Sequence, residues 1–212
     1  MVLLDAEREG EADIAFAGAC ATAELVNFCL SRAKGLLCLS LRPDDAERLG
    51  VEPLPSNGRD RFQTRFGMPI DVDNGISGVS APARAETIRV ASDPASEASM
   101  FIFPGHVHTL IAHPLGSLGR AGHTEAILDL LACAGISGPG VLCEILDRDG
   151  HIATIPSVQR LARAYALPVV DVAEVRAALC RSLDGHRACA RASAGSTPVN
   201  GECCETTAPA GR

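Results

Sequence analysis

Acidic side chains occupy every second position near the start of the chain: Asp5, Glu7, Glu9, Glu11 and Asp13. Residues two apart project from one face of an extended segment, so an extended conformation would gather five carboxylates side by side. Like charges held that close repel one another. A fold retains such a row on a solvated face, beneath a bound cation, or where raised carboxyl pKa values serve proton transfer. The row is therefore a candidate cation or acid–base site, with a solvated face as the alternative.

A second segment with chemical potential, Gly119-Arg-Ala-Gly-His-Thr-Glu125, lies far along the chain. We expect a helix to begin at or just after Thr124, and a helix start presents unpaired N–H groups that bind anions. Arg120 can grip a phosphate through two hydrogen bonds, and Gly122 lets the backbone approach a ligand. An ordinary helix cap beside a surface arginine is the alternative. His123 offers an imidazole, and carboxylates opposite it would favour magnesium or manganese.

Two further segments set ionisable groups among apolar ones. Glu144 follows Leu142 and Cys143 in an apolar run, where a carboxylate must be paired, protonated or functional unless it points outward at the strand end. His106 and His108 stand two residues apart, so they share a face if that segment is extended. Both segments add candidate proton donors and acceptors to the site.

Composition excludes several classes of protein. The 212 residues suffice for one well-buried domain, and with 3% aromatic residues and no Trp the core must be aliphatic. A net charge of −7 without a basic stripe argues against nucleic-acid binding. No apolar run approaches the roughly 18 residues of a membrane span, and the first residues lack the basic start of a secretory signal. We therefore expect a cytoplasmic protein.

The nine cysteines show no CxxC pair. Most stand in apolar stretches, which predicts buried free thiols in a reducing compartment and does not favour a zinc site. From about Asp184 onward Ala, Ser, Thr, Gly and Pro dominate, so residues 184–212, with the Cys203–Cys204 pair, are predicted to be a disordered tail.

Alternating helical and strand-like segments before that tail predict a single-domain α/β (α+β) fold over residues 1–183, with a mixed sheet and flanking helices. Apolar runs, caps and breakers define the segments. Strands are expected at 2–4, 35–41, 140–146 and 168–171, helices at 22–35, 43–49, 123–133, from 156 and at 173–182, and an exposed loop at 51–65.

Several blocks in a fixed order resemble the 3,4-dihydroxy-2-butanone 4-phosphate synthase family of riboflavin biosynthesis. The resemblance covers about residues 1–180, and ordered blocks are more specific than any single motif. The blocks are Arg8-Glu-Gly-Glu-Ala-Asp13, Pro104-Gly-His106, Arg120-Ala-Gly-His-Thr-Glu125 and Gly140-Val-Leu-Cys-Glu144.

The resemblance implies a carbon–carbon lyase that converts D-ribulose 5-phosphate into L-3,4-dihydroxy-2-butanone 4-phosphate and formate with Mg²⁺ (or Mn²⁺). It also implies a homodimer with active sites at the subunit interface. The metal ligands of the family match Glu9 and His123. Its catalytic positions match Cys38, His106 and Glu144, and Asp5 of the acidic row is a further catalytic candidate. Its substrate contacts match Arg8, Glu9, Asp13, Arg120, Ala121, Gly122, His123, Thr124 and Glu144.

These residue types suit the chemistry. Enolisation next to a carbonyl needs a base for the C3 proton and an electrophile on the C2 oxygen, and a metal ion can be that electrophile. Loss of the C1 hydroxyl then needs an acid, and a skeletal rearrangement releases formate. Carboxylates in different environments can divide these proton transfers.

The chain also departs from the family pattern. Gly10 and Ala12 replace the usual Asn and Gly, residues 57–63 replace a Thr-Ser-Ala-Tyr-Gly loop, and Ala83 and Phe103 replace an aspartate and an arginine. A same-fold enzyme for a related sugar phosphate in a specialised pathway is therefore the first alternative. A non-catalytic paralogue that binds a sugar phosphate is the second, and the retained acids argue against it.

Overall fold

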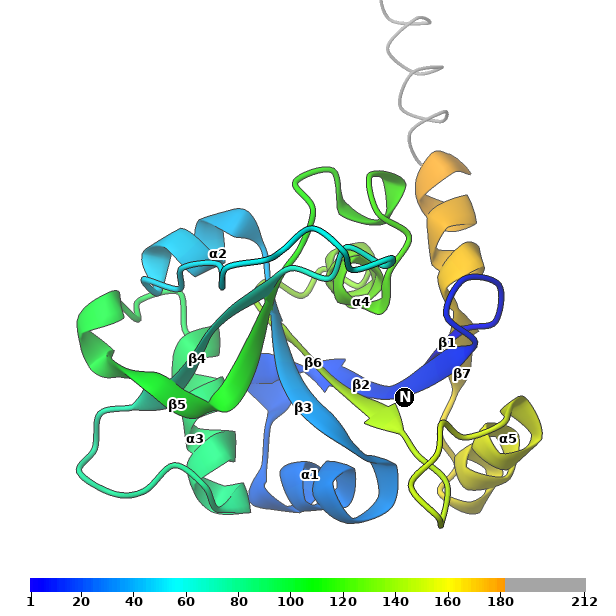
Figure 1. Cartoon of the computed structure of the whole chain (residues 1–212), viewed down its shortest axis with the longest axis horizontal. Helices are drawn as coiled ribbons and strands as arrows, with labels where there is room; N and C mark the ends of the chain where they lie inside the picture. The colour runs from blue at the N-terminus through cyan, green and yellow to red at the C-terminus, as the bar shows by residue number, and fades with distance from the viewer. Residues whose placement is uncertain (182–212) are drawn as a thin grey trace, which may run out of the picture. The chain divides into compact units, whose positions relative to one another are not determined.

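The computed structural model describes residues 1–181, and the contacts within Met1–Ala178 make that segment one compact unit. Its centre is a mixed sheet of seven strands in the order β4-β5-β3-β6-β2-β1-β7 (Figure 1). The α/β class predicted from the sequence is confirmed. The strands are β1 Val2–Asp5, β2 Glu11–Ala17, β3 Lys34–Leu41, β4 Phe66–Val72, β5 Phe101–Ile111, β6 Gly140–Ile145 and β7 Val169–Asp171.

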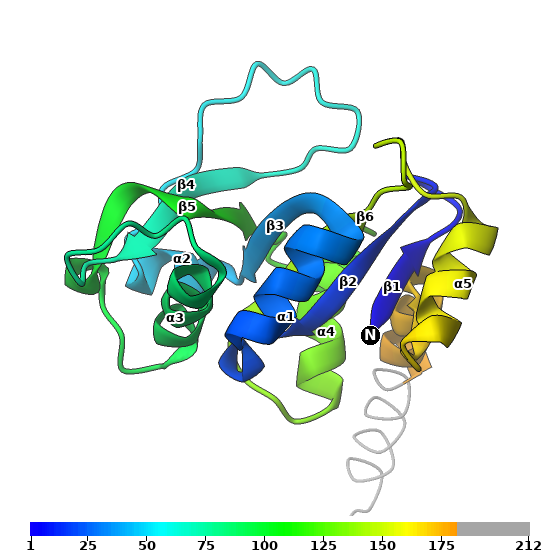
Figure 2. The ribbon, with the colours of Figure 1, turned by 90° about the horizontal axis from the view of Figure 1, so that it is seen from below.

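Helices pack on both faces of this sheet. Helices α1 and α3 lie side by side (Figure 2). The two parallel strand pairs, β3 with β5 and β1 with β7, stand among antiparallel neighbours. The helices are α1 Ala23–Phe28, α2 Pro43–Arg48, α3 Ala81–Ser92, α4 His123–Cys133 and α5 Ile155–Ala164, and a further helix starts at 172.

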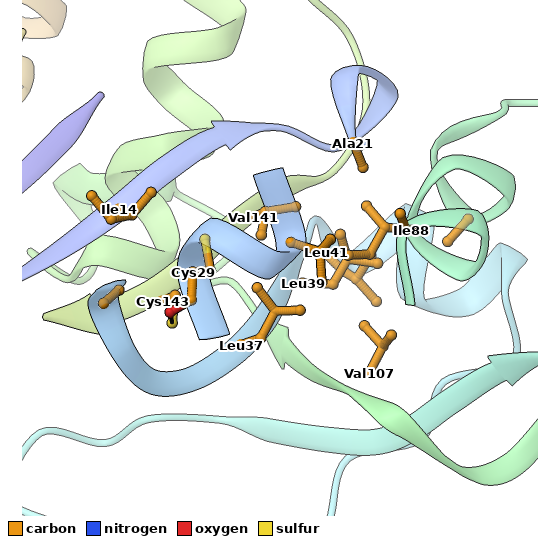
Figure 3. Packing of buried hydrophobic residues seen from close by; sticks show 14 of the residues in the cluster. Ile14, Ala21, Cys29, Leu37, Leu39, Leu41, Ile88, Val107, Val141 and Cys143 are labelled. Carbon is orange, nitrogen blue, oxygen red and sulfur yellow. Dashed lines mark hydrogen bonds between the residues drawn. The ribbon is translucent and has the colours of Figure 1, made fainter. Parts of the chain in front are cut away.

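Strand β3 explains why the core has two parts. Leu37, Leu39 and Leu41 point into the larger apolar cluster, where Ile88 of α3 lies beside Leu41 (Figure 3). Cys38, between them, belongs to a smaller cluster with residues of α4. Because side chains alternate along a strand, a strand buried on both faces is apolar throughout. The sequence prediction of a buried strand here is confirmed.

Most predicted elements lie where the caps and breakers put them. Thr22 caps α1, since its hydroxyl accepts a hydrogen bond from the Leu25 N–H at 3.2 Å. The predicted stop at Gly35 is one residue late, because Lys34 takes the left-handed conformation (φ 71°) and Gly35 already belongs to β3.

Of the six cysteines among residues 1–181, all are free thiols, but only three of them are buried. The expectation that most cysteines are buried is therefore wrong for this part of the chain, because Cys20, Cys133 and Cys180 are exposed. No helix described by the structure is long and apolar enough to cross a membrane. The predicted tail, with Cys203–Cys204, and the domain boundary at 183 lie outside the described residues.

Candidate functional site

The acidic row folds as a hairpin and not as one extended strand. Strand β1 ends at Asp5 and β2 begins at Glu11, and these two residues face each other as register partners. Gly10 adopts φ 70° and donates its N–H to the Asp5 carbonyl at 2.9 Å, which closes the turn. The segment is therefore not extended throughout, and the condition under which five carboxylates would share one face is not met. Glu7 is exposed in the turn, while the hairpin brings other acids of the row together.

Asp13 and Glu144 are register partners on the adjacent strands β2 and β6. Their neighbours Ile14 and Cys143 pack in the larger apolar cluster (Figure 3). Since side chains alternate along a strand, Asp13 and Glu144 point to the opposite face, which α4 covers in part. Cys38 of β3 lies on this same face.

His123, the first residue of α4, is buried against these acids with 6% of its surface exposed. Its Nδ1 lies 3.4 Å from Asp13 Oδ2, while Nε2 is buried without a hydrogen-bond partner in the structure. Burial lowers the pKa of His123. The nearby carboxylates act in the opposite direction, and Glu9 has the largest effect among them. A neutral imidazole with a free nitrogen is the form that binds metal ions.

The acids around His123 titrate unusually. Burial raises the pKa of Asp13 well above its usual range, and the carboxylates of Glu144, Glu11 and Glu9 raise it further. Burial and the same kind of repulsion, led by Glu9, raise the pKa of Glu11. A cation placed among these groups would relieve the repulsion.

The donor set fits a hard divalent cation. Besides His123 Nε2, the buried oxygens Asp5 Oδ2 and Asp13 Oδ1 lack partners. Oxygen ligands with one imidazole are compatible with magnesium or manganese. Within residues 1–181 no three side chains are yet arranged as a metal site, and Glu9 is paired with the Arg8 guanidinium. The residues can therefore hold such an ion once Glu9 leaves Arg8.

Arg120 is fully engaged with protein groups. Its Nη1 lies 2.7 Å from Glu125 Oε2, its Nε donates to the Phe62 carbonyl at 3.0 Å, and its Nη2 donates to Thr64 Oγ1 at 2.8 Å. The Phe62 carbonyl also accepts a hydrogen bond from Arg8. The loop before β4 therefore binds both arginines. Arg120 is not the exposed surface arginine of the alternative interpretation.

The helix start is also one residue earlier than expected. Gly122 is the N-cap and α4 begins at His123, so Thr124 is buried in the first turn. Ala121 lines a cavity of about 490 Å³ together with Arg8 and Arg120. Arg61 and Arg65 from the loop line the same cavity, which makes it strongly cationic and suited to a phosphate group.

We expect Arg120→Ala to lower stability as well as affinity. Glu125 is 1% exposed, and a buried carboxylate that loses its cation costs about 3–5 kcal/mol in free energy of unfolding. A lost phosphate contact adds roughly 1.5–3 kcal/mol in binding. Urea unfolding measures the first effect and calorimetry with phosphorylated and unphosphorylated ligands the second. Arg61→Ala, at an exposed position, is the control for stability. Equal loss of affinity for both ligands would refute the phosphate role.

His106 lies on β5 and is held by a residue that the sequence analysis missed. Buried Asp71 of β4 accepts from the His106 N–H at 2.9 Å through Oδ1, and its Oδ2 lies 2.5 Å from the ring Nδ1. The imidazole is 44% exposed. An aspartate inside the apolar segment Phe66–Val72 was the signal that could have identified it.

That His106 and His108 share a face stays a prediction, because the pairing of β5 with β4 is irregular between Ile102 and Val107. Val107 packs in the larger cluster, so His108 next to it points to the other face. That is the face that carries Cys38, which is the Cα register partner of His108. Burial, with the charges of Glu144 and Asp13, raises the pKa of Cys38 well above its usual range, so its thiol is neutral. The structure thus brings Cys38 to the acids. Among residues 1–181, the hydrogen-bond partner of His106 is Asp71.

Comparison with known proteins gives one consistent family. A family model described as 3,4-dihydroxy-2-butanone 4-phosphate synthase matches residues 1–178. The riboflavin biosynthesis protein RibBA of Salinispora tropica is 39% identical over 176 residues, which cover 82% of this chain and 44% of that protein. The 3,4-dihydroxy-2-butanone 4-phosphate synthase of Pseudomonas aeruginosa is 35% identical over 178 residues, 82% of this chain and 49% of its own. The chain thus spans less than half the length of these curated relatives.

Solved structures give the same result. RibBX of A. baumannii, a two-domain 3,4-dihydroxy-2-butanone 4-phosphate synthase, matches with a TM-score of 0.79 and 32% identity, over 82% of this chain and 52% of that one. A 3,4-dihydroxy-2-butanone 4-phosphate synthase in complex with two magnesium ions matches with a TM-score of 0.78 and 30% identity. That match covers 84% of this chain and 89% of the other.

Proposed function

The chain belongs to the 3,4-dihydroxy-2-butanone 4-phosphate synthase family, and from this we propose that it converts D-ribulose 5-phosphate into L-3,4-dihydroxy-2-butanone 4-phosphate and formate. The observation that carries the proposal is the buried His123 with a free Nε2 among carboxylates. The cationic cavity bounded by Arg8 and Arg120 adjoins this cluster through Arg8, the neighbour of Glu9. A metal-dependent proton-transfer site beside a phosphate pocket is what the reaction requires.

Glu9 and His123 are the proposed ligands of a Mg²⁺ (or Mn²⁺) ion, and a relative solved with two magnesium ions supports the choice of metal. When bound, the ion polarises the substrate carbonyl as a Lewis acid. Asp13 orients the His123 ring through Nδ1, which would leave Nε2 as the nitrogen that holds the ion. For Glu9 to bind, its carboxylate must exchange the Arg8 guanidinium for the metal.

Proton transfers fall to the carboxyl groups on the sheet face. Glu144 accepts the C3 proton in enolisation, and Asp13, whose pKa is raised by burial, donates a proton to the departing C1 hydroxyl. Cys38 and Asp5 line the same cluster as neutral thiol and buried acid. Two carboxyl groups in different environments can thus serve as base and acid.

The phosphate is held by Arg8, by Arg120 and by the segment from Ala121 to Thr124, in which Gly122 is the N-cap of α4. Before substrate binds, the Phe62 carbonyl accepts hydrogen bonds from both guanidiniums. A phosphate is a stronger acceptor than a carbonyl, so its arrival displaces this loop contact.

His106 completes the site in a homodimer, the assembly that we propose. Held by Asp71, its ring offers Nε2 on an exposed part of the sheet. Large apolar side chains of β4, of β5 and of the segment that leads from β4 to α3 are exposed in the single chain, and we propose them as the interface, since exposed apolar surface marks interaction sites. We call this set the patch, and it comprises Phe66, Ile76, Val79, Ile102 and Phe103. Residues 1–183 are the proposed catalytic domain of a cytoplasmic enzyme.

We expect light scattering after size exclusion to give twice the mass of one chain. Ile102→Arg should shift the protein toward the monomer, because burying an unpaired charge in the interface has a large free-energy cost. Ile136→Arg is a matched control, since Ile136 is 42% exposed against 44% for Ile102 and lies outside the patch. A wild-type monomer with full activity would contradict the dimer.

The test of function is incubation of the full chain with ribulose 5-phosphate and magnesium, with formate measured by a coupled dehydrogenase. Release of formate in proportion to substrate consumed supports the lyase. Binding of ribulose 5-phosphate without formate would instead support a related sugar phosphate as substrate. The replaced loop at 57–63 motivates this second candidate, because Arg61 within that loop lines the phosphate cavity.

A further inference from the structure

The pairing of β3 with β6 is irregular at one place, directly opposite Glu144. Lys34 pairs with Ile145, and Leu37 pairs with Cys143. Three steps along β3 therefore match two steps along β6, so Gly35 and Leu36 together oppose the single residue Glu144. Two residues against one is a β-bulge, and bulges beside active sites redirect a side chain.

The bulge touches the Glu144 side chain directly. The Leu36 N–H donates to Glu144 Oε2 at 2.7 Å. A Cβ built on Gly35 would lie 2.6 Å from that same oxygen, 2.7 Å from Glu144 Cβ and 2.4 Å from the Glu144 carbonyl oxygen. Only a residue without a side chain leaves room for Glu144 here.

Neighbouring residues fix the bulge in place. Lys34 enters it in the left-handed conformation, with φ 71°. Its Nζ donates to the Asp147 carbonyl at 3.0 Å, just beyond the end of β6. On the other side of β6, Asp13 is the register partner of Glu144. The carboxylate is thus confined between a bulge on one strand and an acid on the other.

We propose that the bulge at Gly35–Leu36 positions Glu144 for proton transfer. Gly35 provides the space, and the Leu36 N–H fixes Oε2, while Oε1 makes no hydrogen bond within residues 1–181 and remains available to substrate. The inference rests on the proposed function, because proton transfer by Glu144 is a step of the proposed reaction. Gly35 and Leu36 act through Glu144 and are positioning residues.

The expected size of the effect follows from geometry. A proton acceptor works within hydrogen-bond reach of its proton, and a misplacement of about 1 Å can cost about a hundredfold in rate. A methyl group at Gly35 must displace Glu144, both backbone and side chain, by a distance of that order, since contacts of 2.4 Å to its carbonyl oxygen and 2.6 Å to Oε2 are shorter than Cβ atoms show.

The kinetic test is a double-mutant cycle in the full chain. Gly35→Ala is expected to lower kcat about tenfold to a hundredfold with little change in KM. In a Glu144→Gln background the same change should cost nothing further, because the group that it displaces no longer transfers protons. Gly140→Ala is the matched control, because Gly140 is on the same strand as Glu144 but its added Cβ would lie 2.6 Å from Ile127 of α4. It should lower the melting temperature, and its effect on kcat should not depend on whether residue 144 is Glu or Gln. Additive losses, or a fully active Gly35→Ala, would overturn the inference.

A second measurement does not depend on turnover or on a folded Gly35→Ala. In ¹⁵N-labelled protein the Leu36 amide proton should show the hydrogen bond to the Glu144 carboxylate, and Glu144→Gln should shift its resonance. A Leu36 amide indifferent to Glu144 overturns the inference even if formate is released. Absence of formate from the wild type refutes the proposed function instead, and the amide signal then decides the positioning by itself.

Discussion

Glu144→Gln is expected to reduce turnover by roughly a hundred- to ten-thousandfold while the fold and substrate binding remain nearly unchanged. The amide has the shape of the carboxylate and can still accept the Leu36 N–H, so the bulge keeps its partner. What is lost is the capacity to take up a proton. The change also removes the charge that, after burial, contributes most to the raised pKa of Asp13. We therefore expect the pKa of Asp13 to fall in the variant.

Single-turnover rates and melting temperatures measured on the same preparation separate a chemical role from a structural one. Glu52→Gln, at an exposed position, controls for the loss of one charge. A Glu144 that only stabilises the sheet predicts a lower melting temperature with normal turnover per folded molecule. That result would remove Glu144 from the mechanism.

Exhaustive chelation is expected to abolish turnover, and Mg²⁺ or Mn²⁺ should restore it. The reason is that the buried Nε2 of His123 and the unpartnered oxygens of Asp5 and Asp13 need a cation to offset their desolvation. Binding should also be visible without substrate. Calorimetric titration with Mn²⁺ should give a site that His123→Asn and Glu9→Gln each weaken.

Arg8 provides the internal control for this experiment. Because its guanidinium pairs with Glu9, Arg8→Met should free the carboxylate and leave Mn²⁺ binding intact or tighter, even where turnover falls through loss of the phosphate contact. Unchanged activity after complete removal of divalent ions would refute the metal role of Glu9 and His123.

The sequence by itself determined many of the local elements, although β2, β4, β5 and α3 were not identified from it. The helix at His123–Cys133 follows from its apolar face and from Gly135, which takes φ 71° just beyond its end. The strand Gly140–Ile145 follows from its continuous apolar content. These signals are readable because caps, breakers and periodicity act between residues a few positions apart.

The family and the candidate residues were also readable from sequence, since ordered motifs with fixed spacing carry them. The residues that each of these candidates contacts could not be predicted from the sequence. Arg120 could be seen as a phosphate ligand, but its contacts with Phe62 and Thr64 join segments more than fifty residues apart. His106 was identifiable, while Asp71, which holds it, belongs to another strand 35 residues away.

Tertiary structure decided how the acids meet. An alternating row predicts one strand, but the turn closed by Gly10 sets Asp5 against Glu11 across a hairpin. Pairing with β6 then brings Asp13 to Glu144, and one extra residue in β3 aims that carboxylate. Register and bulges arise from pairing between distant segments, and the free energy that selects them comes from burial across the whole sheet. For that reason the sequence named the groups of this site, and only the folded sheet fixed their geometry.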